Sequence, residues 1–221
     1  MLITYTSKSG KRYTYHEMFN DFTKDLVIVS SDDITLRVDS GVLKASSSVF
    51  ESMVSTCGSD DIPKLDHTSS TLSIYLSFLF AETQPTFKLT KSDWEAFTKA
   101  VKLCETYDTP EVIRKMLGSL ALFGLEHHFH LFEIAAMVND VFTATKLILV
   151  IGKYDPDEAK WNSNFWDLDE WDVDLIEDLP GHWVWAYMKA HHATDSGIRR
   201  EDYWAAIAAK FITSAIPFWW C

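Results

Sequence analysis

A histidine-rich run is the first cluster in this chain whose residue types could bind a metal ion. It reads Glu126-His127-His128-Phe129-His130, and His127 and His130 are three residues apart, so they could share a helix face as zinc ligands do. The run lacks the H-E-x-x-H spacing that supplies the ligands and the general base of a zinc hydrolase. We therefore predict partly exposed imidazoles at the start of a helix and no bound metal.

An acidic run, D-L-D-E-W-D-V-D at residues 167–174, is the second such cluster. A calcium-binding EF-hand loop that starts at Asp167 needs glycine at its sixth position, where this chain has Asp172. A loop that starts at Asp155 needs glutamate at its twelfth position, which is Trp166. The pattern favours a solvated acidic face with apolar side chains packed inward.

Nucleophile and cofactor motifs are missing from the sequence. It contains no G-x-S-x-G, P-loop or G-x-G-x-x-G pattern. Cys57, Cys104 and Cys221 form no C-x-x-C pair, and Cys104 lies in a helical pattern typical of a small buried residue. We therefore expect that the protein is not an enzyme and that it binds no cofactor. A metal-dependent enzyme built on the histidines or the acidic run is the alternative from a different class.

The charge of the chain limits the class of partner. The 221 residues have a formal net charge of -12, which disfavours nucleic acid because phosphate binding needs clustered Lys and Arg. Residues 119–221 carry 7 basic and 16 acidic side chains, a net charge of -9, and we expect this acidity to steer a basic partner. The most apolar stretch, Leu147 to Ile151, is too short to span a bilayer, and the N-terminus lacks a secretory pattern. These features predict an intracellular protein of the cytoplasm or the nucleus, with no membrane association.

The elements that would position these side chains begin with strands. Apolar runs at 25–30 and 34–38, joined by a polar turn, predict a β-hairpin. The alternating residues 1–15 predict a smaller hairpin, and residues 62–65 a lone extended segment.

Helical periodicity dominates the rest of the chain. A short helix over residues 48–54 has either Ser47 or Ser48 as its N-cap. Proline at position 110, after Thr109, marks the start of another helix. Further helices are predicted from residue 69 or 70 to about 80, and over 90–107, 128–139, 141–151, 183–192 and 201–215.

Eight of the nine tryptophans follow residue 160. We predict that Trp183 and Trp204 belong to the core of a helical domain. The terminal Phe218-Trp219-Trp220, after the helix-ending Pro217, docks either on its own domain or on a partner, because large aromatic rings bury much area at little entropic cost.

Particular positions within these elements match those of a known family. They are Asp25, Val42-Leu43, Ser46, Phe50, Met53, Ile62-Pro63, Leu76 to Phe80, Ala100, Tyr107 and Val112-Ile113. With the order of the elements, they resemble the BTB/POZ domain, and the chain is similar to BTB proteins of the fungal, basidiomycete type. The resemblance implies an α+β BTB/POZ fold over residues 1–120, followed by an all-α C-terminal extension over residues 121–221. It also implies a non-enzymatic protein–protein interaction module, which acts as an adaptor or scaffold or associates with itself.

One departure from the family concerns its charged pocket. The family usually has His and then Arg or Lys before the V/I-L pair, where this chain has Asp39, Ser40 and Gly41. In members that dimerise, the basic residue pairs with the aspartate that corresponds to Asp25. Asp39 cannot form that pair, and we expect two neighbouring carboxylates to repel each other. Monomer and dimer therefore both remain open.

A second use of the family is as a substrate adaptor on a cullin ubiquitin-ligase scaffold. Such members often carry a hydrophobic-x-Glu motif near the end of the third helix, and Phe80-Ala81-Glu82 has these residue types. The alternative interpretation is that Phe80 belongs to the core and Glu82 is solvated. Either way, the sequence predicts protein partners, which are a second copy of the chain or a cullin scaffold.

Overall fold

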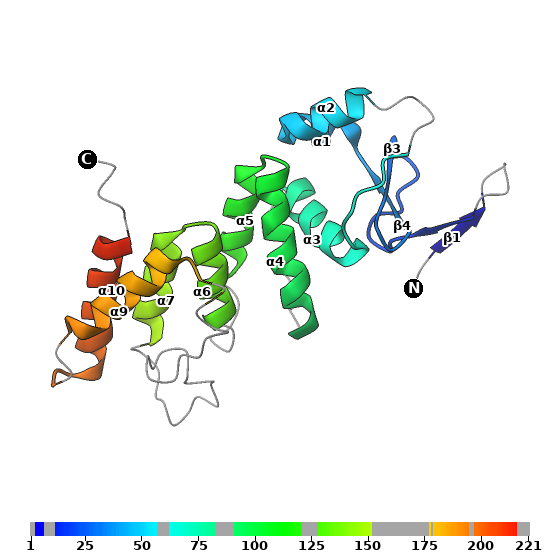
Figure 1. Cartoon of the computed structure of the whole chain (residues 1–221). Helices are drawn as coiled ribbons and strands as arrows, with labels where there is room; N and C mark the ends of the chain where they lie inside the picture. Colours follow the sequence, from blue (N-terminus) through cyan, green and yellow to red (C-terminus); the bar gives the residue numbers. More distant parts are fainter. Residues whose placement is uncertain are drawn as a thin grey trace. The chain divides into compact units, whose positions relative to one another are not determined.

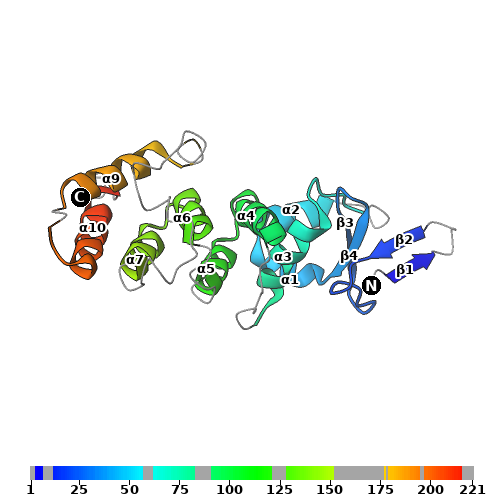
Figure 2. The same cartoon turned by 90° about the horizontal axis from the view of Figure 1, so that it is seen from below.

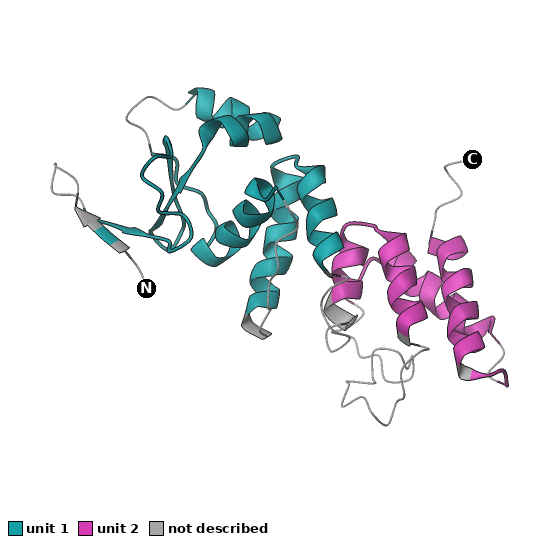
Figure 3. Cartoon of the chain, turned by 180° about the vertical axis from the view of Figure 1, so that it is seen from behind, with its two compact units in different colours: residues 1–122 teal, residues 123–221 magenta. Residues whose placement is uncertain are grey.

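The structure is a computed structural model, and contacts between Cα atoms divide the chain into two compact units, Met1–Leu122 and Phe123–Cys221 (Figure 3). Unit 1 is α+β, and the described part of unit 2 is helical. No helix within the described residues is long and apolar enough to cross a membrane. The structure describes residues 3–6, 12–56, 62–82, 91–120, 128–151, 177, 179–194 and 197–215.

The sheet of unit 1 has four strands in the order β1-β2-β4-β3 (Figure 1). Both predicted hairpins are confirmed, because β1 pairs antiparallel with β2 and β3 pairs antiparallel with β4. The two hairpins join through a parallel pairing of β2 with β4. The strands are β1 (Ile3–Thr6), β2 (Arg12–Tyr15), β3 (Leu26–Val29) and β4 (Ile34–Val38).

The predicted extended segment near residue 64 lies along the edge of β3 that faces away from β4. Val29 donates its backbone N–H to the Pro63 carbonyl at 2.9 Å, and its own carbonyl accepts from the Leu65 N–H at 2.8 Å. This segment forms an isolated parallel bridge between Val29 and Lys64. The prediction of a lone extended piece is confirmed, and the segment covers an edge that would otherwise expose unpaired backbone groups.

Five helices complete the described part of unit 1. The predicted helix after Ser47 is confirmed, but another short helix that was not predicted precedes it. The central one of the five, α3, contacts α1, α4, α5 and β4, and eight of its twelve residues are buried. The helices are α1 (Ser40–Ser46), α2 (Ser48–Thr56), α3 (Ser69–Phe80), α4 (Lys91–Thr106) and α5 (Pro110–Leu120).

Ser47, and not Ser48, is the N-cap of α2. Its hydroxyl accepts the backbone N–H of Phe50 at 3.1 Å and donates to the carbonyl of Tyr107, at the end of α4. The ring of Phe50 stacks on that of Tyr107, with centroids 4.3 Å apart, and also contacts Tyr75. Ser47 therefore caps one helix and also ties it to another that is distant in sequence.

Unit 2 contains the four predicted helices, with boundaries close to those expected. Its core centres on Trp183, whose ring lies 5.5 Å from that of Phe132 and 5.3 Å from that of Phe211. Trp183 and Trp204 are both buried, as predicted. The described helices are α6 (His128–Met137), α7 (Val141–Ile151), α9 (Gly181–His192) and α10 (Arg200–Ala215).

Candidate interaction surface

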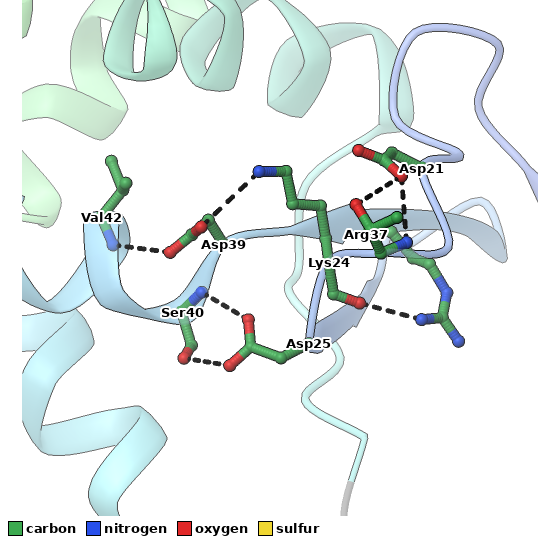
Figure 4. A network of polar contacts seen from close by, with 8 residues as sticks. Asp21, Lys24, Asp25, Arg37, Asp39, Ser40 and Val42 are labelled. Carbon is green, nitrogen blue, oxygen red and sulfur yellow. Dashed lines mark hydrogen bonds and ion pairs between the residues drawn. The ribbon is translucent and has the colours of Figure 1, made fainter.

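Asp25 lies at the start of β3, and its carboxylate is held by the first residue of α1 (Figure 4). Its Oδ1 accepts the backbone N–H of Ser40 at 2.9 Å, and its Oδ2 accepts the Ser40 hydroxyl. The side-chain and then the backbone hydrogen bond from Ser40 lower the pKa of Asp25 below its ordinary value. This carboxylate therefore stays ionised and fixes the join between strand and helix.

Asp39 is the N-cap of α1. Its Oδ1 accepts the backbone N–H of Val42 at 3.1 Å, and its Oδ2 lies 3.6 Å from the Lys24 ammonium. A Cβ placed on Gly41 would lie 3.2 Å from the Asp39 carboxylate, so glycine leaves room for this cap. Asp39 and Gly41 thus belong to a local polar network that also includes Lys24 and Val42.

The repulsion expected between Asp25 and Asp39 stays a prediction. Each carboxylate has its own partners, Ser40 for Asp25 and both Lys24 and Val42 for Asp39. The hydrogen bonds from Ser40 lower the pKa of Asp25, which is opposite to the direction in which a neighbouring carboxylate would move it. The fold brings these donors to the two carboxylates, and the spacing of the residues along the chain does not reveal them.

Arg37 holds the loop between β2 and β3 against the sheet. Its Nη1 donates to the Lys24 carbonyl at 2.9 Å, and its guanidinium lies 5.0 Å from the ring centroid of Phe22. That ring is 51% exposed, and Met18 in the same loop is also exposed. The loop therefore presents apolar side chains to solvent beside the charged network.

Two more exposed apolar side chains come from the neighbouring helices. Val42 in the first turn of α1 and Val49 in the first turn of α2 both face solvent. The two helices pack against each other (Figure 1). Together with Met18 and Phe22 of the β2–β3 loop, these two valines are exposed apolar side chains of unit 1. Asp25 ends that loop and Asp39 precedes α1.

Phe80 and Glu82 lie at the C-terminal end of α3. Phe80 is half-buried and Glu82 is exposed, so the two side chains that make up the candidate motif differ in accessibility. Lys115 of α5 donates to the carbonyls of Phe78 and Ala81, at 3.4 and 2.9 Å, and satisfies the end of the helix. Lys115 thus contacts the residue that directly precedes Glu82.

The β1–β2 hairpin extends beyond the rest of the sheet. All four residues of β1 pair with β2, but β2 pairs with β4 only through Thr14 and Tyr15. Figures 1 and 2 both show this two-stranded ribbon projecting from β4. Among the described residues, β1 pairs only with β2, and no described strand covers its other edge.

Several predicted candidates lie outside the residues that the structure describes. These are the side chains of the histidine run at 126–130, the acidic run at 167–174, Cys57, Cys221 and the terminal Phe218, Trp219 and Trp220. Within the described residues, no group of three His, Cys, Asp or Glu side chains could hold a metal ion. The metal-dependent alternative is neither supported nor tested by these observations.

An exposed aromatic surface on α9 was missed by the sequence argument. Trp185 and Met188 face solvent, whereas Trp183, two residues before Trp185, is fully buried. Residues two apart on a helix point about 200° apart, so this spacing could have indicated that one of the two tryptophans is exposed.

Comparisons with known proteins do not assign the chain to a family. No family model matches it, and no curated protein matches it. The likeness to BTB/POZ domains therefore rests on the residues of this chain and on the α+β character of unit 1.

Proposed function

We propose that this chain is a non-enzymatic protein–protein interaction module, in which unit 1 is a BTB-type domain that self-associates through the edge of β1. The observation that carries the proposal is the projecting β1–β2 ribbon. An edge strand offers its free N–H and C=O groups as a template for a strand of another chain. A two-stranded ribbon is also marginal by itself and gains stability when a further strand pairs with it.

The polar network favours this edge over the charged pocket used by many family members. Asp25 and Asp39 are already satisfied by Ser40, Val42 and Lys24 of the same chain. A second subunit that paired with either carboxylate would have to compete with those contacts within the chain. Strand addition leaves them intact, and the exposed side chains of α1, α2 and the β2–β3 loop add apolar area that association could bury.

Light scattering over a concentration series tests self-association. We expect a mass of about twice the 25.3 kDa chain, since closed dimers are the commonest assembly. Thr4→Lys places a charge on the exposed β1 edge and should shift the mass to that of one chain, because edge charges oppose strand pairing. Thr106→Lys on α4 is the matched control, since Thr106 is also exposed, and should remain dimeric.

A monomeric wild type at all concentrations would refute self-association, and the module would then recruit a different protein. A dimer that survives Thr4→Lys would show that another surface makes the contact.

The second candidate is the cullin-type adaptor, and the exposure of Glu82 at the end of α3 favours it. A cullin N-terminal region immobilised on resin should retain the wild-type chain and lose Glu82→Ala. Glu105→Ala, which removes an exposed carboxylate from α4, is the control and should be retained like the wild type. Failure of the wild type to bind would exclude this role.

A further inference from the structure

Helix α9 presents an amphipathic surface whose outer side is aromatic and basic. Its buried side chains form the centre of the core of unit 2. On the outer side, Trp185 is 56% exposed and Met188 is 41% exposed. The residues that face outward recur every three or four positions, as one stripe of a helix requires, and they are His182, Trp185, Met188, Lys189 and His192.

A shallow groove of about 480 Å³ runs along this stripe. It is lined by Trp185, Met188, Lys189, His192 and Ala193. The Lys189 ammonium lies 4.5 Å from the centroid of the Trp185 ring, within the range of a cation–π contact. This contact holds both side chains in place, so a ligand finds a charged group and an apolar wall already arranged.

The local charge of the groove is opposite to that of the chain as a whole. Among the described residues that line it there is no carboxylate, and α9 itself contains no Asp or Glu. Lys210 of α10 brings a second ammonium to its rim, because its Nζ donates to the Ala193 carbonyl and, at 3.1 Å, to the Thr194 hydroxyl. Since exposed charges are screened beyond about 8 Å at physiological salt, a bound carboxylate would respond mainly to these nearby cations.

We infer that this groove binds an acidic peptide segment of a partner protein. A carboxylate of the peptide contacts Lys189, and a neighbouring aliphatic side chain packs on Trp185 and Met188. Charge complementarity selects an acidic partner, and the flat aromatic wall supplies the buried apolar area that a short peptide needs. This differs from the basic partner that the overall acidity of residues 119–221 suggested, because contact is governed by the charge at the site.

The inference does not depend on self-association of unit 1, since the groove lies entirely within unit 2. A chain that is monomeric would still bind the peptide, and a dimer would do so at each copy. The two proposals can therefore fail separately.

Fluorescence anisotropy of a labelled peptide that alternates Asp or Glu with Leu tests the site on the full-length chain. The same peptide with Asn and Gln in place of the acids is the ligand control, and labelled oligothymidylate represents a single-stranded nucleic acid. We expect saturable binding of the acidic peptide that weakens at high salt. The neutral peptide should bind about tenfold more weakly or worse, which corresponds to the loss of one good charged contact.

Matched variants locate the binding. Trp185→Ala and Lys189→Glu should each weaken the acidic peptide by about tenfold or more, as loss of an interface anchor does. Phe142→Ala and Lys146→Glu, which alter an exposed aromatic and an exposed lysine on α7, should change it less than about twofold. Circular dichroism should be unchanged in all four, because these side chains are exposed.

Four results would overturn the inference. The first is absence of any peptide binding by the wild type. The others are equal binding of the neutral peptide, tighter binding of oligothymidylate than of the acidic peptide, and equal effects of the α9 and α7 variants.

Discussion

Replacement of Ser47 by alanine should destabilise unit 1 far more than replacement of its neighbour Ser48. Ser47 is 3% exposed, caps α2 through the Phe50 N–H, and donates its hydroxyl to the Tyr107 carbonyl. Loss of an N-cap costs about 1 kcal/mol. A buried carbonyl left without its donor costs about 1–3 kcal/mol more. The expected destabilisation is therefore about 2–4 kcal/mol, a large part of the total stability of a small domain.

Hydrogen exchange of the full-length chain, read by mass spectrometry on peptides from α2 and α4, measures this loss within unit 1. Since about 1.4 kcal/mol is a factor of ten, amides that exchange by opening of the unit should exchange roughly 30-fold to 700-fold faster in Ser47→Ala. Ser48 is exposed, and Ser48→Ala should change the free energy of opening by less than about 0.5 kcal/mol.

A glycine variant separates the two contributions. Glycine replaces serine at an N-cap at a cost of only a few tenths of a kcal/mol, so Ser47→Gly mainly removes the bond to Tyr107. Equal effects of Ser47→Ala and Ser48→Ala would refute the dual role of Ser47. A wild-type-like Ser47→Gly would show that the bond to Tyr107 contributes nothing and that capping is the whole effect.

Three further results are expected. Trp183→Ala, in the core of unit 2, should destabilise that unit by about 3–5 kcal/mol in urea unfolding, and a loss below about 1 kcal/mol would contradict its central position. Burial raises the pKa of the Cys104 thiol to about 12, so iodoacetamide at pH 8 should label this residue only after unfolding, as read by peptide mass spectrometry. Hydrogen bonds from Ser40 lower the pKa of Asp25, so they stabilise the fold fully above the ordinary value of 3.8 and less as the pH falls through the lowered pKa. The difference in unfolding free energy between wild type and Ser40→Ala should therefore be present at neutral pH and shrink below pH 3.8, and a difference that grows on acidification would refute this assignment.

Most elements of the fold could be predicted because their signals are local. The period-two runs around β3 and β4 and the helical spacing of α4, α7 and α10 depend only on residues that are adjacent along the chain. Helix α1 was missed because it is short and separated from α2 by one residue, Ser47. The pairing of β2 with β4 could not be predicted in the same way, because it joins two hairpins and no local pattern specifies it.

The candidate site was predicted less well than the fold. Asp25 and Asp39 were both selected from the sequence, but the donors that hold their carboxylates, Ser40 for Asp25 and Lys24 for Asp39, reach them only in the folded chain. The groove on α9 was not predicted at all. Its residues form no recognisable sequence motif. They can be identified as a surface only by their exposure and by the cation–π contact between Trp185 and Lys189 in the folded chain.

The sequence alone determined the strands, nearly all of the helices and the acidity of the second half, because these follow from the order and type of neighbouring residues. It also required that Trp183 and Trp185, about 200° apart on one helix, face opposite sides. Only the tertiary structure decided which of the two is buried, because Phe132 and Phe211, which pack on Trp183, come from α6 and α10. In the same way, Tyr107 at the end of α4 distinguishes Ser47 from Ser48, since a contact between distant segments exists only once the chain has folded.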